Sequence, residues 1–304
     1  MKKVFINTLM DIASKRKEIC LITGDLGYGV LDPFIETYPE RFINAGISEQ
    51  NMTGVAAGMA KEGKTVVTYS IGNFPTMRCL EQIRNDCAYH DADVKIVCPG
   101  GGLSYGKLGM SHHATEDIAI MRALPNVKVF APGDIVEVEK ITEAMFKEKG
   151  TCYLRLGKCG EKIHKGLETI EIGKAIKVQE GTDIAIFSTG SILGEVCKAV
   201  KKLEDEGLSI AQYSFPTIKP IDKDIILKKA KECKIIVSVE EHNIIGGLGS
   251  SVAEIMAENS GISRLIRIGI NDTYTSIVGQ EEYLRQQYGL SSNKIYNKIM
   301  EETS

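Results

Sequence analysis

The chain has 304 residues, of which 43% are hydrophobic and 25% are charged, and its formal net charge is -3. This length allows two domains of ordinary size, each with its own core. The balanced charge gives no electrostatic reason to expect nucleic acid or a membrane surface as a partner. No run of about 18 apolar residues suggests a membrane span, and the first residues do not read as a signal peptide. We therefore expect a cytoplasmic protein.

Strand-like and helical runs alternate through the first half of the chain. Continuous apolar strands separated by helices are typical of a parallel sheet with helices on both faces. The sequence predicts one doubly wound domain over residues 1–160. Its expected helices are 4–17, 78–88, 115–123 and 135–147, and its expected strands are 19–23, 65–69, 94–98, 127–130 and 151–155.

Residues 41–60 are predicted to form a buried strand, a turn and a helix. Glu49 lies where the strand gives way to the helix, and the carboxyl ends of parallel strands are where α/β folds bind ligands. An acid in the first turn of a helix can equally well favour the positive end of the helix dipole. Gly54, Ala57 and Gly58 share one helix face, where we expect another backbone to approach closely.

The alternation restarts after a polar, glycine-containing segment, which we predict to be a linker over residues 161–178. A second, smaller α/β domain is expected over 179–304, with strands near 183–191, 209–214, 235–240 and 264–268 and helices between and after them. The glycines of 246–249 lack a full phosphate-binding motif, so close packing of strand against helix is the preferred interpretation.

Eight cysteines are scattered through apolar segments without close pairs. Zinc sites use closely spaced ligand pairs, so we interpret the thiols as small buried hydrophobes in a reducing compartment. These residues are Cys20, Cys79, Cys87, Cys98, Cys152, Cys159, Cys197 and Cys233.

A long loop at 99–113 holds five glycines and ends in His112 and His113. Loops of this length are often functional. The neighbouring Glu116 and Asp117 suggest metal binding, but adjacent histidines rarely converge and a third ligand with suitable spacing is missing. Proton transfer by one histidine is better supported, because imidazole titrates near neutral pH. Solvated histidines in a capping loop remain the structural alternative.

Several short motifs then occur in a fixed order, at residues 46–52, 81–85, 111–117, 121–126, 240–243 and 246–249. In this order and spacing the chain resembles the C-terminal half of transketolase, and more closely the separate C-terminal subunit of split transketolases. The resemblance covers residues 7 to about 290. It implies a pyrimidine-binding domain followed by the transketolase C-terminal domain, with thiamine diphosphate bound at a subunit interface.

The resemblance also assigns roles around the cofactor's pyrimidine ring. Glu49 matches the glutamate that shares a proton with a ring nitrogen and favours the imino tautomer. Ile47 and Phe74 match residues that pack on the ring, although without the resemblance a core position is the preferred interpretation of Phe74. Two positions that are usually aromatic in this pocket are occupied by Ile71 and Met77.

Other positions bear on the substrate and the diphosphate. His112 matches a histidine that donates hydrogen bonds to substrate oxygens, and Arg155 matches a phosphate-binding arginine. Leu108 stands where transketolase has an aspartate that reads a hydroxyl beside the reacting carbon. The histidine and serine that share phosphate binding with the arginine are replaced by Gly100 and Gly29, which argues against ordinary pentose-phosphate transfer. Asp25 is a candidate cofactor contact, although the segment Gly24-Asp25-Leu26 lacks the second glycine of the diphosphate and metal motif.

These assignments predict a transketolase-like subunit that transfers a two-carbon ketol unit between sugar or other carbonyl substrates. An N-terminal partner subunit is expected to hold the diphosphate and Mg²⁺ (or Ca²⁺), so this chain alone should be inactive. We also expect self-association through the pyrimidine-binding domains, as in a heterotetramer.

Two alternatives remain open. One is a decarboxylating relative, similar to 1-deoxyxylulose-5-phosphate synthase or the beta chain of 2-oxoacid dehydrogenases. Leu108 is compatible with that alternative, because the donor substrate of a decarboxylating relative lacks the hydroxyl that the aspartate of transketolase reads. The other is a binding-only regulatory subunit, against which the retention of Glu49 and His112 argues.

Overall fold

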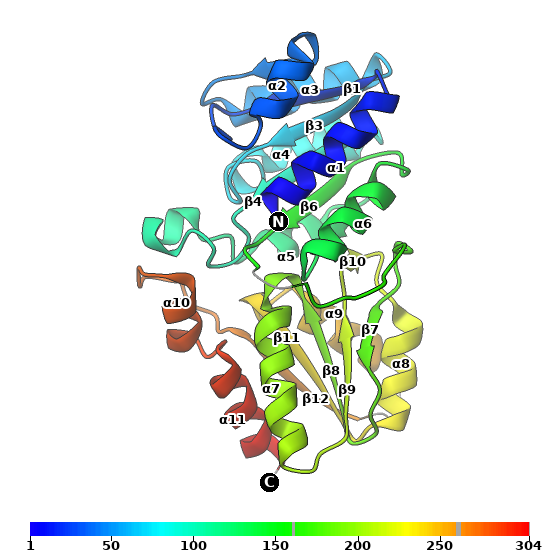
Figure 1. Cartoon of the computed structure of the whole chain (residues 1–304), viewed down its shortest axis with the longest axis vertical. Coiled ribbons are helices and arrows are strands. Elements are labelled where there is room, and N and C mark those ends of the chain that lie inside the picture. Colours follow the sequence, from blue (N-terminus) through cyan, green and yellow to red (C-terminus); the bar gives the residue numbers. More distant parts are fainter. Residues whose placement is uncertain (160–161, 260–262, 304) are drawn as a thin grey trace.

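The computed structural model describes residues 1–159, 162–259 and 263–303 and shows two sheets, one above the other in Figure 1. Both sheets are covered by helices, which confirms the predicted α/β class. Within these ranges none of the helices has the length and apolar character needed to cross a membrane.

The first sheet has seven strands in the order β10-β5-β6-β4-β3-β1-β2. Six of them run parallel to their neighbours, as predicted, whereas β10 is antiparallel to β5. The strands are β1 (Ile19–Thr23), β2 (Phe42–Asn44), β3 (Thr65–Tyr69), β4 (Val94–Pro99), β5 (Lys128–Phe130), β6 (Cys152–Leu156) and β10 (Thr217–Lys219).

Successive residues of the central strands pack on opposite faces of this sheet. Leu21 and Val67 join the core under α1, whereas Ile22 and Val66 join the core under α3. Alternation in a strand buried on both sides produces this arrangement. The first face carries α1 (Lys2–Lys15), α2 (Asp32–Thr37) and α6 (Ile135–Met145), and the second carries α3 (Glu49–Lys61), α4 (Leu80–Gln82) and α5 (Asp117–Ala123) (Figure 1).

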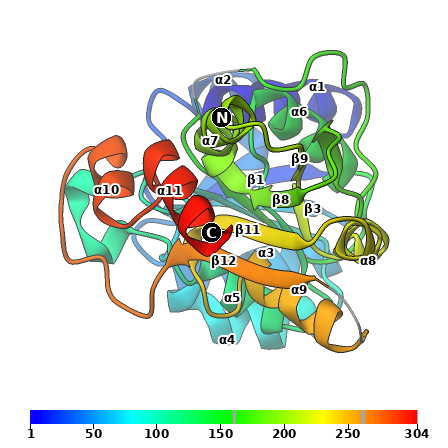
Figure 2. The same cartoon turned by 90° about the horizontal axis from the view of Figure 1, so that it is seen from below.

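The second sheet has five strands in the order β12-β11-β8-β9-β7, of which β7 is antiparallel to β9. Its strands are β7 (Ile176–Gln179), β8 (Ile184–Thr189), β9 (Ile210–Ser214), β11 (Ile235–Asn243) and β12 (Arg264–Ile270). Figure 2 shows helices on both of its sides, namely α7 (Leu193–Asp205), α10 (Glu281–Gln287) and α11 (Ser292–Thr303) on one and α8 (Lys223–Glu232) and α9 (Leu248–Ala257) on the other.

The two sheets are joined by shared core rather than by the linker alone. Tyr153 of the first sheet belongs to the same buried cluster as Phe187 and Phe215 of the second half. The strand β10 follows β9 in the chain but extends the first sheet, and β7 begins at Ile176, inside the predicted linker. The shared core and the strand β10 therefore pack the two halves against each other.

Three local features differ from the sequence-based expectation. The strand β2 is partly exposed instead of buried, because it lies at the edge of the sheet. The helix expected over 78–88 begins as a tight turn at Met77–Cys79 (η2) and widens into a π-helix over Ile83–Ala88 (η3). Finally, among the described residues, no atom beyond the adjoining backbone of the same helix would lie within 4 Å of a Cβ built on Gly54 or Gly58. Within the described ranges, the predicted close backbone contact is therefore not made.

Candidate active site

Three predicted site residues come together at the carboxyl-end edge of the first sheet. Glu49 begins α3 after β2, Phe74 follows β3, and His112 ends the short helix η5 (Met110–His112) after β4. Gly24, at the end of β1, makes room for the acid, since a Cβ there would lie 3.2 Å from Cγ of Glu49. Parallel strands open into their ligand crevice at this edge.

Glu49 is a buried carboxylate with a cationic partner. Glu49 is 2% exposed, and Nη1 of Arg78 donates a hydrogen bond to Oε2 of Glu49 at 2.6 Å. A buried charge needs such a partner, because burial in isolation is strongly unfavourable. The side chain belongs to the first turn of α3 but is directed to Arg78. The interaction of Glu49 with the positive end of the helix dipole is therefore secondary to its ion pair with Arg78.

The half-buried ring of Phe74 contacts two site residues. The guanidinium carbon of Arg78 lies over the ring at 4.6 Å from its centroid. The imidazole of His112 meets the ring edge to face, with centroids 5.2 Å apart and planes inclined by 73°. Such geometries are favourable for cations and for aromatic pairs. Glu49, Arg78, Phe74 and His112 thus form one continuous cluster.

Asn73 fixes the loop that carries His112 against the loop that carries Phe74. Its Nδ2 donates to the backbone carbonyls of Ser111 at 3.2 Å and of His113 at 2.8 Å. The ring Nδ1 of His112 lies 3.1 Å from Oγ of Ser111. These contacts orient the half-buried imidazole toward the cluster.

His113 differs from its neighbour in both burial and hydrogen bonding. It is buried, with Nε2 3.3 Å from the carbonyl of Gly106 and Nδ1 2.6 Å from Oγ1 of Thr275. Because a carbonyl only accepts, Nε2 carries the hydrogen and Nδ1 accepts from the threonine. Burial lowers the pKa of His113 below its ordinary value despite these bonds. We interpret His113 as a neutral strut between the two halves.

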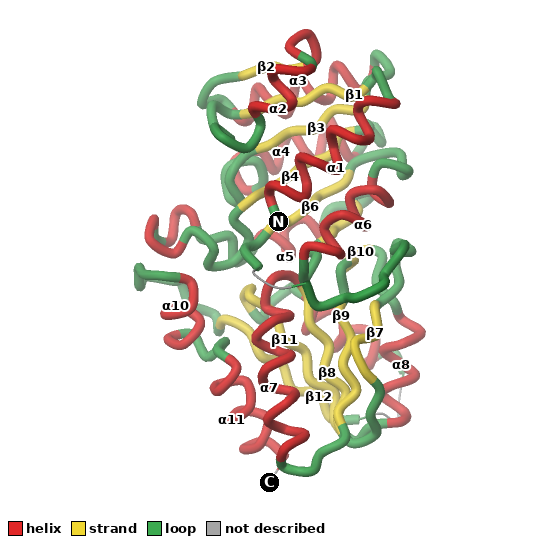
Figure 3. Tube along the Cα trace, viewed as in Figure 1, coloured by secondary structure: helices red, strands yellow, loops and turns green. Residues whose placement is uncertain are grey.

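The glycine-rich loop lies beside the segment that precedes α10 (Figure 3). The backbone amide of Gly279 donates to the carbonyl of Gly106 at 3.2 Å. A Cβ on Gly102, where φ is +65°, would lie 2.2 Å from Oε1 of Glu241, which instead accepts from the amide of Leu103 at 2.8 Å. Glycine is thus required where the loop crosses the C-terminal half. No set of three or more potential metal-binding side chains was found in the described ranges.

Asp25 lies directly after Gly24 in the loop that follows β1. Its Oδ1 accepts from Nδ2 of Asn44 at 3.0 Å and from the hydroxyl of Tyr28 at 2.8 Å. These hydrogen bonds lower the pKa of Asp25, with that from Asn44 having the larger effect. The exposed carboxylate is therefore ionised and held in place near Glu49.

The apolar side chains assigned to the site are open to solvent in the single chain. Ile47 is 80% exposed and Leu108 is 54% exposed, while Met77 is also exposed and Ile71 is half-buried. Exposed apolar groups around a buried acid are typical of a surface that another molecule covers.

Arg155 is buried away from this cluster. Its Nε donates to Oδ2 of Asp117 at 2.8 Å, and Nη2 donates to the carbonyls of Ala114 and Glu241 at 2.8 and 2.9 Å. This arrangement ties β6 to α5 and to β11 of the second half. Within the chain this guanidinium is engaged by one carboxylate and two carbonyls, and the phosphate contact that the resemblance implies for Arg155 stays a prediction.

The glycine turn before α9 has a packing role. Oε2 and Oε1 of Glu240 accept from the amides of Leu248 and Gly249, both at 2.8 Å, and so occupy the helix start. A Cβ on Gly247 would lie 1.9 Å from Glu240 Oε2. This agrees with the preferred interpretation of close packing rather than phosphate binding.

A cavity of about 450 Å³ adjoins the site loops. The first half contributes Asn73 and Met77, which flank Phe74, and Met110 of η5. The second half contributes Asn243 and a segment at 272–274. The cavity therefore lies between the two halves of the chain, next to the cluster.

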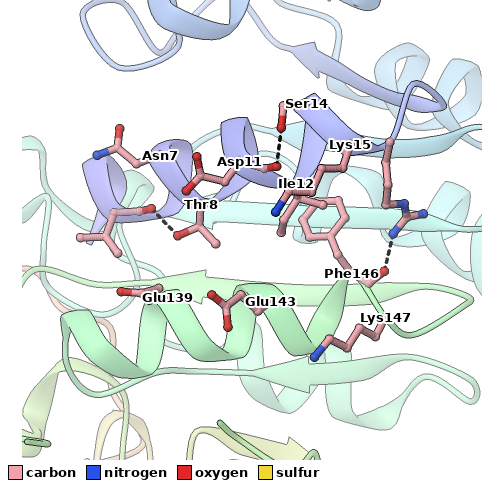
Figure 4. Close-up of a pocket in the computed structure, with 12 residues that line it drawn as sticks. Asn7, Thr8, Asp11, Ile12, Ser14, Lys15, Glu139, Glu143, Phe146 and Lys147 are labelled. Atoms are coloured by element: carbon pink, nitrogen blue, oxygen red, sulfur yellow. Dashed lines mark hydrogen bonds between the residues drawn. The ribbon is translucent and has the colours of Figure 1, made fainter. Parts of the chain in front are cut away.

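A larger groove, of about 750 Å³, lies between α1 and α6 (Figure 4). Its walls combine acids such as Asp11 and Glu143 with cations such as Lys15 and Lys147, around an apolar floor that includes Phe146. The groove opens on the helix layer opposite α3 and contains none of the clustered residues. Its size therefore does not mark the candidate active site.

Arg78 is the member of the cluster that sequence reasoning missed. It was predicted only as the start of a helix. The contact to Glu49 spans 29 positions in the chain, and such a contact leaves no local pattern.

Comparisons with known proteins identify the class to which this fold and site belong. The family model for the transketolase pyrimidine-binding domain matches residues 1–159, and that for the transketolase C-terminal domain matches residues 173–295. The chain belongs to the transketolase family.

Individual relatives narrow the comparison. A Methanocaldococcus jannaschii protein described as a transketolase C-terminal section is 41% identical, with 99% of this chain and 96% of that protein covered. One of the subunits of an apulose-4-phosphate transketolase from Actinobacillus succinogenes is 36% identical, with 86% and 85% covered. The solved structure of a split-gene transketolase, an inactive beta4 tetramer, is 32% identical over 98% and 96% of the two chains, with a TM-score of 0.88. This chain is thus similar to C-terminal subunits of split transketolases.

Proposed function

We propose that this chain is the pyrimidine-binding subunit of a heteromeric, thiamine-diphosphate-dependent transketolase that transfers a two-carbon ketol unit between sugar or sugar-derived substrates. The observation that carries this proposal is the buried Glu49 beside Phe74 and His112 at the carboxyl-end edge of the sheet. Buried acids in such clefts are typical of functional sites.

The residues present fit the aminopyrimidine end of the cofactor. Oε2 of Glu49 already binds a flat nitrogen donor, and Phe74 already carries a flat cation on its ring. When bound, thiamine diphosphate supplies a carbon nucleophile that can carry the ketol unit. In this proposal Glu49 holds a proton at the ring nitrogen and Phe74 stacks on the ring. Ile47, Ile71 and Met77 supply apolar contact.

His112 is proposed to bind the substrate. Its imidazole is positioned by Phe74 and Ser111 at the same edge as Glu49, next to the cavity of about 450 Å³. An N–H donor fixed in this position stabilises negative charge that develops on a substrate oxygen.

The charged end of the cofactor is proposed to be held by a partner. An N-terminal subunit would bind the diphosphate and its Mg²⁺ (or Ca²⁺), with Asp25 contacting the cofactor from this chain. The exposed Ile47, Tyr28 and Met77 lie on the pyrimidine-binding half, where contact with the partner and with a second copy of this chain would bury them. The chain alone would then be inactive.

A decarboxylating reaction is the second candidate, and Leu108 is the observation that favours it. Its exposed apolar side chain cannot accept a hydrogen bond from a donor hydroxyl. A donor without that hydroxyl, such as a 2-oxoacid, would lose nothing at this position.

Reconstitution tests both candidates. The chain is mixed with the N-terminal subunit, thiamine diphosphate and Mg²⁺, and is supplied with ketose donors, phosphorylated or not, and separately with pyruvate. We expect ketol transfer by the complex and none by either subunit alone. Release of carbon dioxide from pyruvate without ketol transfer would favour the decarboxylating candidate. Activity of this chain alone would contradict the proposal, and so would a verified complex that is inactive with every donor.

A further inference from the structure

Arg78 closes the cluster described above from the solvent side. Its side chain is 44% exposed, whereas that of Glu49 is 2% exposed. The guanidinium therefore reaches inward from the surface to cover a buried carboxylate, and the flat face of the group lies over Phe74.

The contacts of Arg78 are those that the proposed function gives to the aminopyrimidine ring. Both groups are flat, and both would use Oε2 of Glu49 and the ring of Phe74. The guanidinium does so as an N–H donor, and the pyrimidine ring would do so through the nitrogen that shares a proton with the acid. The other carboxylate oxygen, Oε1, is directed toward Gly24, where a built Cβ would be 3.4 Å away. The oxygen on the open side is therefore already occupied by Arg78.

The two arrangements exclude each other in space. The guanidinium and the pyrimidine ring would use the same oxygen of Glu49 and the same ring of Phe74, so the cofactor cannot enter while Arg78 keeps these contacts.

We propose that Arg78 is a placeholder that occupies the pyrimidine pocket of the cofactor-free subunit and must swing out before the cofactor can bind. This inference rests on the proposed function. In the cofactor-free chain the arginine spares Glu49 the large penalty of an unpaired buried charge. The partial exposure of Arg78, in the short turn η2, gives the displaced guanidinium access to water.

A placeholder weakens the apparent affinity for the cofactor. The measured Kd equals the intrinsic Kd divided by the fraction of molecules whose pocket is open. Removal of the guanidinium should therefore tighten binding, by about tenfold if the open form is about a tenth of the population. A residue that helped to hold the cofactor would have the opposite effect.

The test is calorimetric titration of thiamine diphosphate, with Mg²⁺ present, into the assembled two-subunit complex. Arg78→Met is compared with the wild type and with Arg264→Met. The control removes an exposed arginine of β12 that pairs with Glu302 of α11, in the second half of the chain. We expect a Kd about tenfold lower for Arg78→Met and an unchanged Kd for Arg264→Met. An unchanged or higher Kd for Arg78→Met overturns the placeholder. A wild-type complex that binds no cofactor overturns the proposed function, and the placeholder with it.

A second pair of measurements covers failure of the methionine variant to assemble. Arg78→Gln keeps an N–H donor for Glu49 but not the charge, and it too should bind the cofactor more tightly than the wild type. In the lone chain, Arg78→Met should lower the melting temperature, and adding Glu49→Gln should recover most of that loss. A glutamine variant with wild-type affinity, or an unshifted melting temperature for Arg78→Met, would refute the placeholder.

Discussion

At the scale of single residues, Arg155 and Asp117 form a buried ion pair that includes no residue of the cluster around Glu49. The hydroxyl of Tyr153 also donates to Asp117, and the carbonyls of Ala114 and Glu241 accept from Arg155. Removal of one member of such a pair leaves the other charge buried and unpaired. Arg155 should therefore matter for stability before it matters for substrate binding.

Replacement of Arg155 by methionine should lower the free energy of unfolding by about 3–5 kcal/mol, as measured by urea denaturation of the lone chain. The exposed-arginine variant Arg264→Met serves as control and should change it by less than about 1 kcal/mol. A stable Arg155→Met chain whose complex shows a raised KM for phosphorylated donors alone would contradict this purely structural role and support the phosphate contact that the resemblance implies.

The resemblance to the transketolase family predicted Glu49, Phe74 and His112 as members of one site, and each of them follows a strand of the first sheet. The partners of Arg78 and Arg155 were beyond its reach. Each depends on a contact with a residue far along the chain, at a distance of 29 and 38 positions respectively. Whether an arginine points to solvent or into a core is decided by such contacts, which leave no periodic pattern.

At the scale of elements, the start of the linker is fixed to α6 by a buried polar cluster. Nε2 of His164 lies 2.7 Å from Oε1 of Glu137, and Oδ2 of Asp134 accepts from the amides of Ile163 and His164. Burial alone would lower the pKa of His164, but the hydrogen bond and negative charge of Glu137 outweigh it and raise the pKa. The start of the linker is thus held by a histidine whose protonated form Glu137 favours.

This pair should make the stability of the chain depend on pH. Because the folded-state pKa of His164 is raised, its contribution is complete below the ordinary value of about 6.5 and is lost as pH rises through the raised value. The free energy of unfolding of the wild type should exceed that of His164→Asn by about 1–3 kcal/mol near pH 6. This difference should shrink at higher pH. Urea denaturation of both chains at pH values from about 6 upward measures this difference. A difference that is constant or grows with pH would contradict the assignment.

Continuous apolar strands were predictable, whereas two short strands with weaker patterns were not. The strands at 19–23 and 65–69 were predicted with the observed ends, because every residue in them is buried. The strands β7 and β10 were missed. Their extended conformation is stabilised by pairing with β9 and β5, and their own sequences do not indicate it. The π-helical turn at Ile83–Ala88 likewise has a pattern indistinguishable from that of an ordinary helix.

At the scale of the whole molecule, the two halves share a core and enclose a cavity beside the site. The class of fold and the order of the halves were predictable from the alternation of elements and from the resemblance. The added strand β10 and the struts made by His113 and Arg155 were not, because they join segments that no local pattern connects. The exposed apolar groups near Glu49 agree with a subunit whose site is completed by other chains.

The central claim is that Glu49 activates a cofactor whose charged end another subunit holds. The ketol-transfer rate constant of the reconstituted complex tests it most directly, with Glu49→Gln compared with Glu62→Gln, an exposed acid just after the same helix. We predict that Glu49→Gln lowers kcat by about 100-fold or more while the complex still assembles, and that Glu62→Gln leaves kcat unchanged. A Glu49→Gln complex with wild-type kcat would contradict the claim.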